Sequence, residues 1–238
     1  MSFVTSSDGR PRQARAERTR SLIVEAAAKA FAEHGYDGVS LNDLITATAI
    51  SKGAFYFHFS SKQELALAAF RAKQEELIGR LSGEGVSYPN AADQVRGILR
   101  RRAELVSADP SLRCVIRLGS DLGARSGPGS EYASFQDLAV DAIADLVRRG
   151  IRTGEFGEQL DPRASARAIF AWIVGMDSLS LLESDAGDLL DRTDELLALL
   201  IPALTARSQP KAAAGNTGTA QPTAGAPGAL QPRKRGNR

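Results

Sequence analysis

Aromatic rings and positive charges crowd into one short stretch of the chain, SKGAFYFHFSSKQEL, which covers residues 51–65. Tyr56 and His58 can donate hydrogen bonds to phosphate oxygens. Lys62 falls in the first turn of a following helix, where a cation opposes the helix dipole unless an anion lies nearby. Gly53, near a helix start, lets backbone amides approach a phosphate without a Cβ in the way. These residue types point to a phosphate-binding surface; the competing interpretation is an amphipathic rim with solvated lysines.

Catalytic and metal-binding arrangements are the alternatives to weigh. The histidines His34 and His58 lie far apart in the sequence, Cys114 has no catalytic context, and neither CxxC nor HExxH spacing occurs. The glycine-rich segment GARSGPGS lacks the Gly-Lys-Ser/Thr ending of a phosphate loop, which favours a plain turn. We therefore expect no enzyme activity, no metal and no cofactor.

The positive charge of the chain is local. The formal net charge is only +2 over 238 residues, but residues 207–238 contain lysines and arginines and no acidic residue, so the remainder is net acidic. Such clusters are either solvated arms or the charge that nucleic-acid phosphates attract. A second basic cluster lies near the N-terminus and comprises Arg10, Arg12, Arg15, Arg18 and Arg20.

Composition and the lengths of the apolar runs indicate where in the cell the protein is expected. With 43% hydrophobic and 24% charged residues, the chain has the composition of a soluble globular protein. The longest uninterrupted apolar run, LLALLIPAL at 196–204, is much shorter than the ~20 residues that cross a bilayer, and the N-terminus shows no apolar leader. A single cysteine excludes an intramolecular disulfide. We expect a cytoplasmic protein with no membrane partner.

Helical periodicity runs through the chain without any sustained strand-like alternation, which predicts an all-α fold. The first helix is expected over residues 15–34, with Gly35 as its C-terminal cap. Each of the next helices is preceded by a residue whose side chain can accept from free backbone amides. These N-cap candidates are Ser40 with Asp43 three residues on, Ser51, Ser61 with Glu64, and Asp161 followed by a proline.

Two of the short helices, in SLNDLITATAISKGAFYFHF, have the spacing of a helix-turn-helix, whose second helix enters the DNA major groove. Phe55 and Phe59 share one face of that second helix and are predicted to fill a core against the first helix. A first helix ending in FAEHGY, then VSLNDLITATAISKGAFYFHFSSKQEL, resembles the N-terminal domain of TetR-family transcriptional repressors. The KGAFYFHFSSK form is most similar to the branch that contains the γ-butyrolactone autoregulator receptors.

The resemblance implies a TetR-like fold of about nine helices, with a three-helix DNA-binding domain and a helical ligand-binding and dimerisation domain. The implied divisions are a flexible basic arm at 1–14, the helix-turn-helix domain at 15–60, the ligand-binding and dimerisation domain at 61–206 and a disordered basic tail at 207–238. The positions that the resemblance implies as contacts to double-stranded operator DNA are Leu41, Ser51, Lys52, Gly53, Ala54, Tyr56, His58 and Lys62.

The resemblance also implies a homodimer on a palindromic operator, with the last two helices paired in a four-helix bundle and recognition helices about 34–36 Å apart. A strip of small residues would allow close helix approach, and leucines would add apolar area; simple core packing is the other interpretation of the leucines. The predicted interface residues are Ala171, Gly175, Ser178, Leu189, Leu196, Leu197 and Leu200.

A small hydrophobic signalling ligand is the remaining implied partner. Phe135 stands where these receptors usually have a tryptophan, and Val174 where they commonly have a threonine, so the effector is predicted to be more apolar than a typical butyrolactone, or unrelated to it. A regulator that answers another hydrophobic ligand or drug, and more distantly a helical enzyme or adaptor, are the alternatives. The predicted ligand residues, each of which could instead be plain core, are Cys114, Val115, Leu118, Phe135, Leu138, Phe170, Trp172 and Val174.

Overall fold

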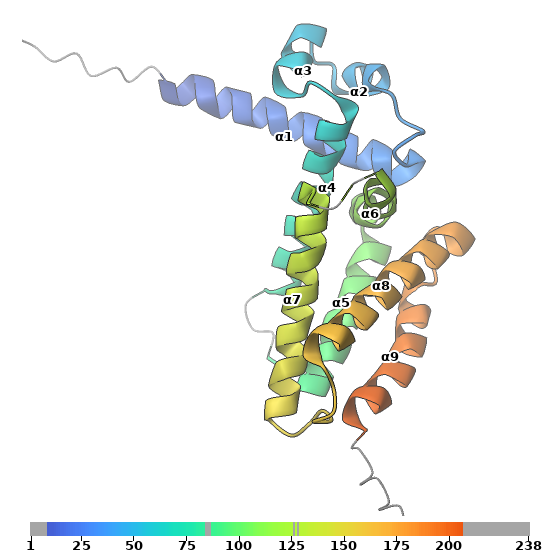
Figure 1. Cartoon of the computed structure of the whole chain (residues 1–238). Helices are drawn as coiled ribbons and strands as arrows, with labels where there is room; N and C mark the ends of the chain where they lie inside the picture. Colours follow the sequence, from blue (N-terminus) through green and yellow to red (C-terminus); the bar gives the residue numbers. More distant parts are fainter. Residues whose placement is uncertain (1–8, 84–86, 126, 128, 207–238) are drawn as a thin grey trace, which may run out of the picture. The chain divides into compact units, whose positions relative to one another are not determined.

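The computed structural model describes residues 9–83, 87–125, 127 and 129–206. Within those residues every regular element is helical, which confirms the predicted all-α class (Figure 1). The helices are α1 Gly9–His34, α2 Leu41–Thr48, α3 Lys52–His58, α4 Lys62–Leu81, α5 Ala91–Ala108, the 3-10 turn Pro110–Leu112, α6 Arg113–Arg125, α7 Glu131–Arg152, α8 Pro162–Ser184 and α9 Leu189–Thr205.

The first helix differs from its predicted start. α1 begins at Gly9 instead of Arg15, so part of the arm expected at 1–14 is helical. Helix-forming Gln13 and Ala14 extend the helix backwards, and the Gln13 amide donates to the Glu17 carboxylate one turn on. Residues 1–8 and the tail expected to be disordered at 207–238 lie outside the described residues.

Local capping chemistry sets the boundaries of α2, α3 and α4. The Ser40 hydroxyl accepts the Asp43 amide at 3.2 Å while the Asp43 carboxylate accepts the Ser40 amide at 3.0 Å, which confirms the predicted capping box. The hydrogen bond from the Ser40 side chain is the main cause that lowers the pKa of Asp43. Ser51 caps α3 as predicted by accepting the Ala54 amide at 3.3 Å.

The N-terminal cap of α4 involves two serines, Ser60 and Ser61, where only Ser61 was predicted. Ser61 accepts the Glu64 amide at 3.1 Å, as expected. The Glu64 carboxylate, however, accepts the amide and hydroxyl of Ser60, at 2.9 and 2.8 Å, instead of reaching Ser61. The two hydrogen bonds lower the pKa of Glu64 and fix the link between α3 and α4.

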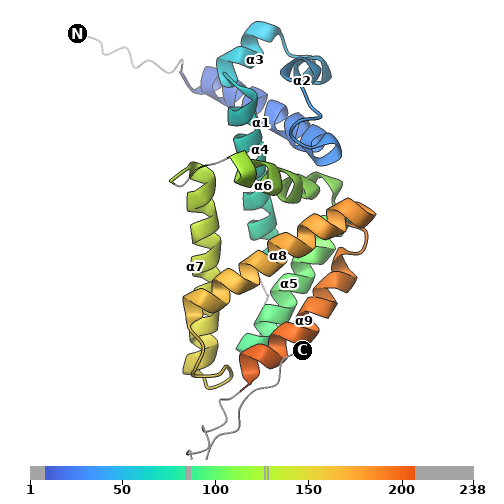
Figure 2. The ribbon, with the colours of Figure 1, turned by 45° about the vertical axis from the view of Figure 1, so that its right-hand side comes forward.

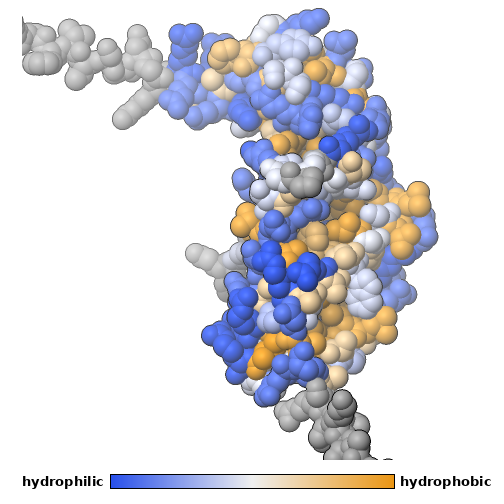
Figure 3. Space-filling view, in the orientation of Figure 1, coloured by the Kyte–Doolittle hydropathy of each residue, from blue (hydrophilic) through white to orange (hydrophobic). Residues whose placement is uncertain are grey.

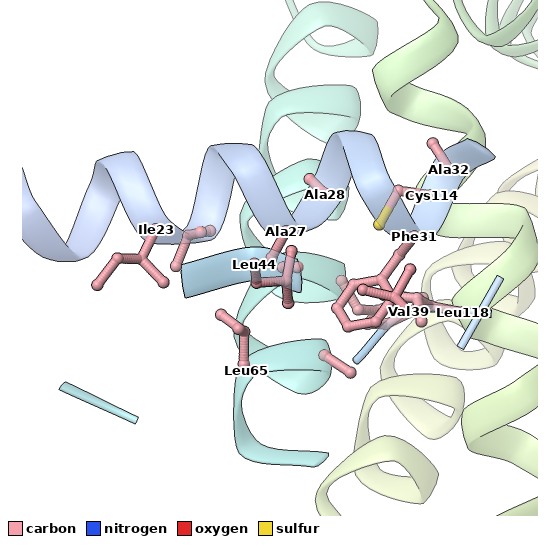
Figure 4. Close-up of a cluster of buried hydrophobic side chains, with 14 of the residues drawn as sticks. Ile23, Ala27, Ala28, Phe31, Ala32, Val39, Leu44, Leu65, Cys114 and Leu118 are labelled. Carbon is pink, nitrogen blue, oxygen red and sulfur yellow. The ribbon is translucent and has the colours of Figure 1, made fainter. Parts of the chain in front are cut away.

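One continuous apolar core ties the first three helices to the rest of the molecule. Phe55 and Phe59 are fully buried with Phe31 of α1, as predicted, and the cluster continues through α4 to Cys114 and Leu118 of α6. Figure 4 shows α1 side chains converging with Leu44, Leu65, Cys114 and Leu118. The first three helices are thus packed directly onto α4 and α6.

The second half is a layered helical bundle. α7 packs along α8 and α5 packs along α9, while α4 and α6 contact α1 (Figure 2). α8 is long and apolar enough to cross a membrane by length and composition alone, since an 18-residue window has a mean hydropathy of 1.3, which the search for uninterrupted apolar runs missed. Only 22% of that window is buried, so α8 carries an apolar face that its own chain leaves uncovered.

Candidate functional site

The outer face of α3 collects the exposed members of the predicted DNA-contact set. Ser51 caps the helix, and the burial of Phe55 and Phe59 on one side turns Lys52, Gly53 and Tyr56 to the other. A Cβ added to Gly53 would meet nothing within 4 Å, so no contact inside the protein demands glycine there. The opening is therefore available to a bound group such as a phosphate.

Phe57 is a member of this surface that the sequence analysis did not assign. Its ring is 80% exposed and lies edge-on to the His58 imidazole, with ring centroids 5.2 Å apart. A phenyl group this exposed on a helix offers apolar contact of the kind that suits a thymine methyl group. The signal in the sequence was the third aromatic of the FYF triplet, at a position that the buried Phe55–Phe59 face excludes from the core.

Leu41 and Ala54 are only half-buried, and Leu41 packs against the core cluster, so part of its side chain is committed to folding. His58 is likewise half-buried. Their assignment as DNA contacts stays a prediction. Of the N-terminal basic cluster, Arg12, Arg15, Arg18 and Arg20 are exposed, and the Arg20 guanidinium carbon lies 4.6 Å from the centre of the Phe59 ring.

Lys62 belongs to a cluster around Tyr36, in the turn after α1, which we call the hub at Tyr36. Its other members are Asp121 and Arg125 of α6. The Lys62 ammonium lies 4.3 Å from the centre of the Tyr36 ring, and the guanidinium carbon of Arg125, on α6, lies 4.8 Å from it. The Tyr36 amide donates to the Asp121 carboxylate of α6 at 2.9 Å. Gly35 takes the left-handed conformation (φ 69°) that turns the chain into this hub. The cation predicted to face phosphate is thus positioned by α6.

A cavity of about 420 Å³ lies among α4, α5, α6, α7 and α8. Five of the predicted ligand residues line it: Val115, Phe135, Leu138, Phe170 and Val174. Its size falls in the range of small-ligand sites. Lining residues that the sequence analysis did not select include Phe70, Gln74, Ile78, Arg102, Tyr132 and Asp177.

Three predicted ligand residues do not line this cavity. Cys114 and Leu118 are fully buried in the core cluster with α1, on the side of α6 away from the cavity lining. Trp172 is 47% exposed on the outer side of α8. Cys114 and Leu118 are therefore core residues, which was the alternative interpretation of their sequence pattern. Trp172 lies on the outer surface of α8 and not in the cavity.

Several polar groups of the cavity are hydrogen-bonded within the protein. Arg102 and Asp177 form a largely buried ion pair, with one of its two hydrogen bonds at 2.8 Å. The Tyr132 hydroxyl donates to the Gly119 carbonyl at 2.6 Å, and burial raises the pKa of Tyr132. The buried side-chain oxygen of Gln74 accepts no hydrogen bond from any described residue. It is thus a buried acceptor that the described part of the protein leaves unsatisfied.

Comparison with known proteins decides the family. Residues 23–69 match the family of bacterial regulatory proteins described as the tetR family. The HTH-type transcriptional repressor AcnR of Corynebacterium glutamicum is 37% identical over 141 residues, which cover 58% of this chain and 68% of AcnR. The chain belongs to the TetR family. TetR-family proteins are DNA-binding transcription regulators, so the expectation that the chain is not an enzyme is confirmed.

Two further relatives of this TetR-family chain cover more of it. The A-factor receptor protein of Streptomyces griseus is 28% identical over 194 residues, which cover 81% of the chain; the chain spans 66% of the length of that receptor. The solved structure of CprB from Streptomyces coelicolor, in complex with its biological operator sequence, is 25% identical, covers 80% of this chain and 90% of CprB, and has a TM-score of 0.64.

The predicted dimer residues of the TetR-family chain fall into two groups. Ala171 and Gly175 are exposed on α8, and Ser178 is half-buried beside them. The four leucines are buried within their own protomer: Leu189, Leu196, Leu197 and Leu200 are each at most 7% exposed. Because those leucines pack against α5 and neighbouring helices, they offer no area to a partner, and their predicted interface role is corrected to core.

Other side chains of α8 and α9 supply the missing apolar surface. Leu179 and Leu182 of α8 are 48% and 82% exposed, and Leu199 of α9 is 64% exposed. Trp172 also lies on α8. Figure 3 shows hydrophobic residues gathered on the right-hand side, where α8 and α9 lie. These residues were missed because leucine-rich helices do not reveal which face is turned inward until their neighbours are known.

Proposed function

We propose that this chain is a homodimeric repressor that binds palindromic operator DNA through α3 and is released by a small apolar signalling molecule. The observation that carries the proposal is the outer face of α3, where Lys52, Gly53 and Tyr56 are exposed around a helix N-terminus with no protein group above Gly53. A helix N-terminus with free approach is a natural phosphate site. The operator complex of the related CprB supports this use of the fold.

Dimerisation through α8 and α9 is the second part of the proposal. Gly175 carries no neighbour within 4 Å of an added Cβ, so nothing in its own protomer requires a small residue there. A closely approaching partner helix would require a small residue at this position. The surrounding exposed residues Trp172, Leu179, Leu182 and Leu199 give the apolar area that a stable pair needs. Burial in a dimer also accounts for the uncovered apolar face of α8 in a cytoplasmic protein.

The effector class follows from the cavity and from one relative. The lining is mainly aliphatic and aromatic, with Gln74 as a free acceptor and Arg102 and Asp177 already paired. Such a site suits a mostly apolar molecule with a hydroxyl or other donor. The relationship to the A-factor receptor favours an autoregulator of butyrolactone, butenolide or furan type as the effector. The repressor would then control secondary metabolism. An unrelated hydrophobic ligand or drug is the alternative.

The hub at Tyr36 connects this cavity to the DNA-binding surface. Gly119 and Ser120 of α6 line the cavity, and the next residue, Asp121, holds the Tyr36 amide. Lys62 stacks on the ring of that tyrosine. A ligand that shifts this end of α6 therefore displaces Lys62 and α4, and the spacing of the two recognition helices no longer matches the groove.

The test is a mobility-shift assay with DNA flanking the gene of this protein, with and without a synthetic γ-butyrolactone. The proposal predicts a retarded complex that the lactone releases, and a weakened complex for Tyr56→Ala with unchanged helical content. Release only by an unrelated hydrophobic compound would replace the effector class and keep the repressor. The absence of any complex, or full affinity in Tyr56→Ala, would refute binding through α3 and leave a helical adaptor.

A further inference from the structure

A second cavity of about 640 Å³ adjoins α6 and shares no lining residue with the apolar one. It is walled by α1, by the 3-10 turn with the start of α6, and by the end of α8. In Figure 2 the C-terminal end of α8 lies next to α6, and α6 lies next to α1. Its apolar wall is formed by Ala32, Pro110, Leu181 and Leu182. The proposed repressor mechanism involves this cavity only through Leu182, which also belongs to the proposed dimer surface.

Three cations face the cavity: Lys29 from α1, and Arg113 and Arg117 from successive turns of α6. Both arginine side chains are about three-quarters buried, since they are 21% and 25% exposed. Each gives one terminal nitrogen to the carboxylate of Asp185, at 2.7 and 2.9 Å. The Nε atoms of both arginines are buried and meet no acceptor among the described residues.

The acidic residues of the cavity do not balance these cations. Asp185 is shared between the two arginines, and Glu183 pairs with Arg192 outside the cavity. Glu33, whose side chain is 70% exposed, meets only the adjacent His34, at 3.5 Å. Lys29 forms no ion pair within the described part of the chain. Two guanidinium groups and an ammonium thus face two carboxylates, the shared Asp185 and the exposed Glu33, so one positive charge is left over. Each arginine keeps a second terminal nitrogen that donates to no described residue, and a carboxylate or phosphate oxygen would accept from it in a charge-assisted hydrogen bond.

We infer that this cavity binds a small organic anion, with its carboxylate or phosphate group between Lys29, Arg113 and Arg117 and a short aliphatic part against Leu181 and Leu182. The site spans α1 of the DNA-binding domain and α6 and α8 of the other domain. An anion bound there would connect these elements, independently of an apolar ligand in the other cavity. The inference does not depend on the proposed function.

The test uses full-length protein without DNA and inorganic phosphate as the probe, measured by equilibrium dialysis at an ionic strength held constant with chloride. We expect one saturable phosphate site per chain, weakened at least tenfold in Arg117→Gln and severalfold in Lys29→Gln. Arg148→Gln, which removes an exposed arginine of α7, is the matched control and should bind as the wild type does.

Two results would overturn the inference. One is the absence of saturable phosphate binding to the wild type. The other is binding that survives Arg117→Gln and Lys29→Gln but is lost in Lys62→Gln, because the phosphate would then occupy the DNA surface. Circular dichroism checks that Arg117→Gln folds; if it does not, Lys29→Gln decides alone, since Lys29 is exposed and its replacement leaves the core intact.

Discussion

Replacing Gly53 by alanine separates folding from DNA binding. The added Cβ meets nothing within 4 Å in the protein, and alanine exceeds glycine in helix propensity by about 1 kcal/mol in a helix interior and by less in a first turn. The substitution should therefore leave the free energy of unfolding unchanged or raise it slightly. The same Cβ would stand where a phosphate approaches the amides of the α3 N-terminus.

The expected loss of affinity follows from the hydrogen bonds at risk. A hydrogen bond to a charged group contributes roughly 1.5–3 kcal/mol, and a symmetric dimer would lose one in each subunit. The total of about 3–6 kcal/mol corresponds to a roughly 10²- to 10⁴-fold weaker operator complex. Fluorescence anisotropy with a labelled operator measures it. Gly79→Ala is the matched control, because Gly79 is also an exposed helical glycine with open space around its Cα. Equal affinity of Gly53→Ala and the wild type would refute phosphate binding at this helix start.

Three further outcomes are expected. Asp177→Ala should lower the free energy of unfolding by about 3–5 kcal/mol because it leaves the Arg102 charge buried, and Arg102→Met combined with Asp177→Leu should recover most of it; urea denaturation that shows no loss would contradict a buried pair. Burial raises the pKa of the Cys114 thiol to about 12, so the native thiol should resist a disulfide reagent at neutral pH, and stability should fall between the unfolded pKa near 9.0 and about 12 because only the unfolded thiol ionises there; rapid labelling of native protein would contradict this. Gly175→Leu should keep the helical content but yield monomers in sedimentation velocity, and an intact dimer would move the interface away from this part of α8.

Local features of the fold could be predicted because they depend on neighbours in the sequence. The Ser40–Asp43 capping box, the Ser51 cap and the burial of Phe55 and Phe59 all follow from spacing of three or four residues. The same reasoning found half of the α4 cap. It missed that Glu64 reaches Ser60, since a carboxylate can choose between two adjacent serines and only the geometry of the link decides.

Features that depend on tertiary packing could not be predicted. Leu196 and Leu199 are both leucines of α9, yet one is buried and the other is 64% exposed, because α5 covers only one side of the helix. Cys114 and Val115 are adjacent on α6 and both belong to the core cluster, but only Val115 also lines the cavity. The contact between Tyr36 and Arg125 joins residues far apart in the sequence, and no local pattern marks it.

The salt dependence of operator binding tests most directly whether this face of the molecule holds duplex phosphates. If a dimer neutralises about eight phosphates, the logarithm of the association constant should fall with the logarithm of salt concentration with a slope of roughly −7. Lys62→Gln removes one contact from each subunit and should make the slope shallower by about 2. A slope near zero for the wild type, or one unchanged by Lys62→Gln, would contradict the assignment of α3 and the start of α4 as the DNA-binding surface.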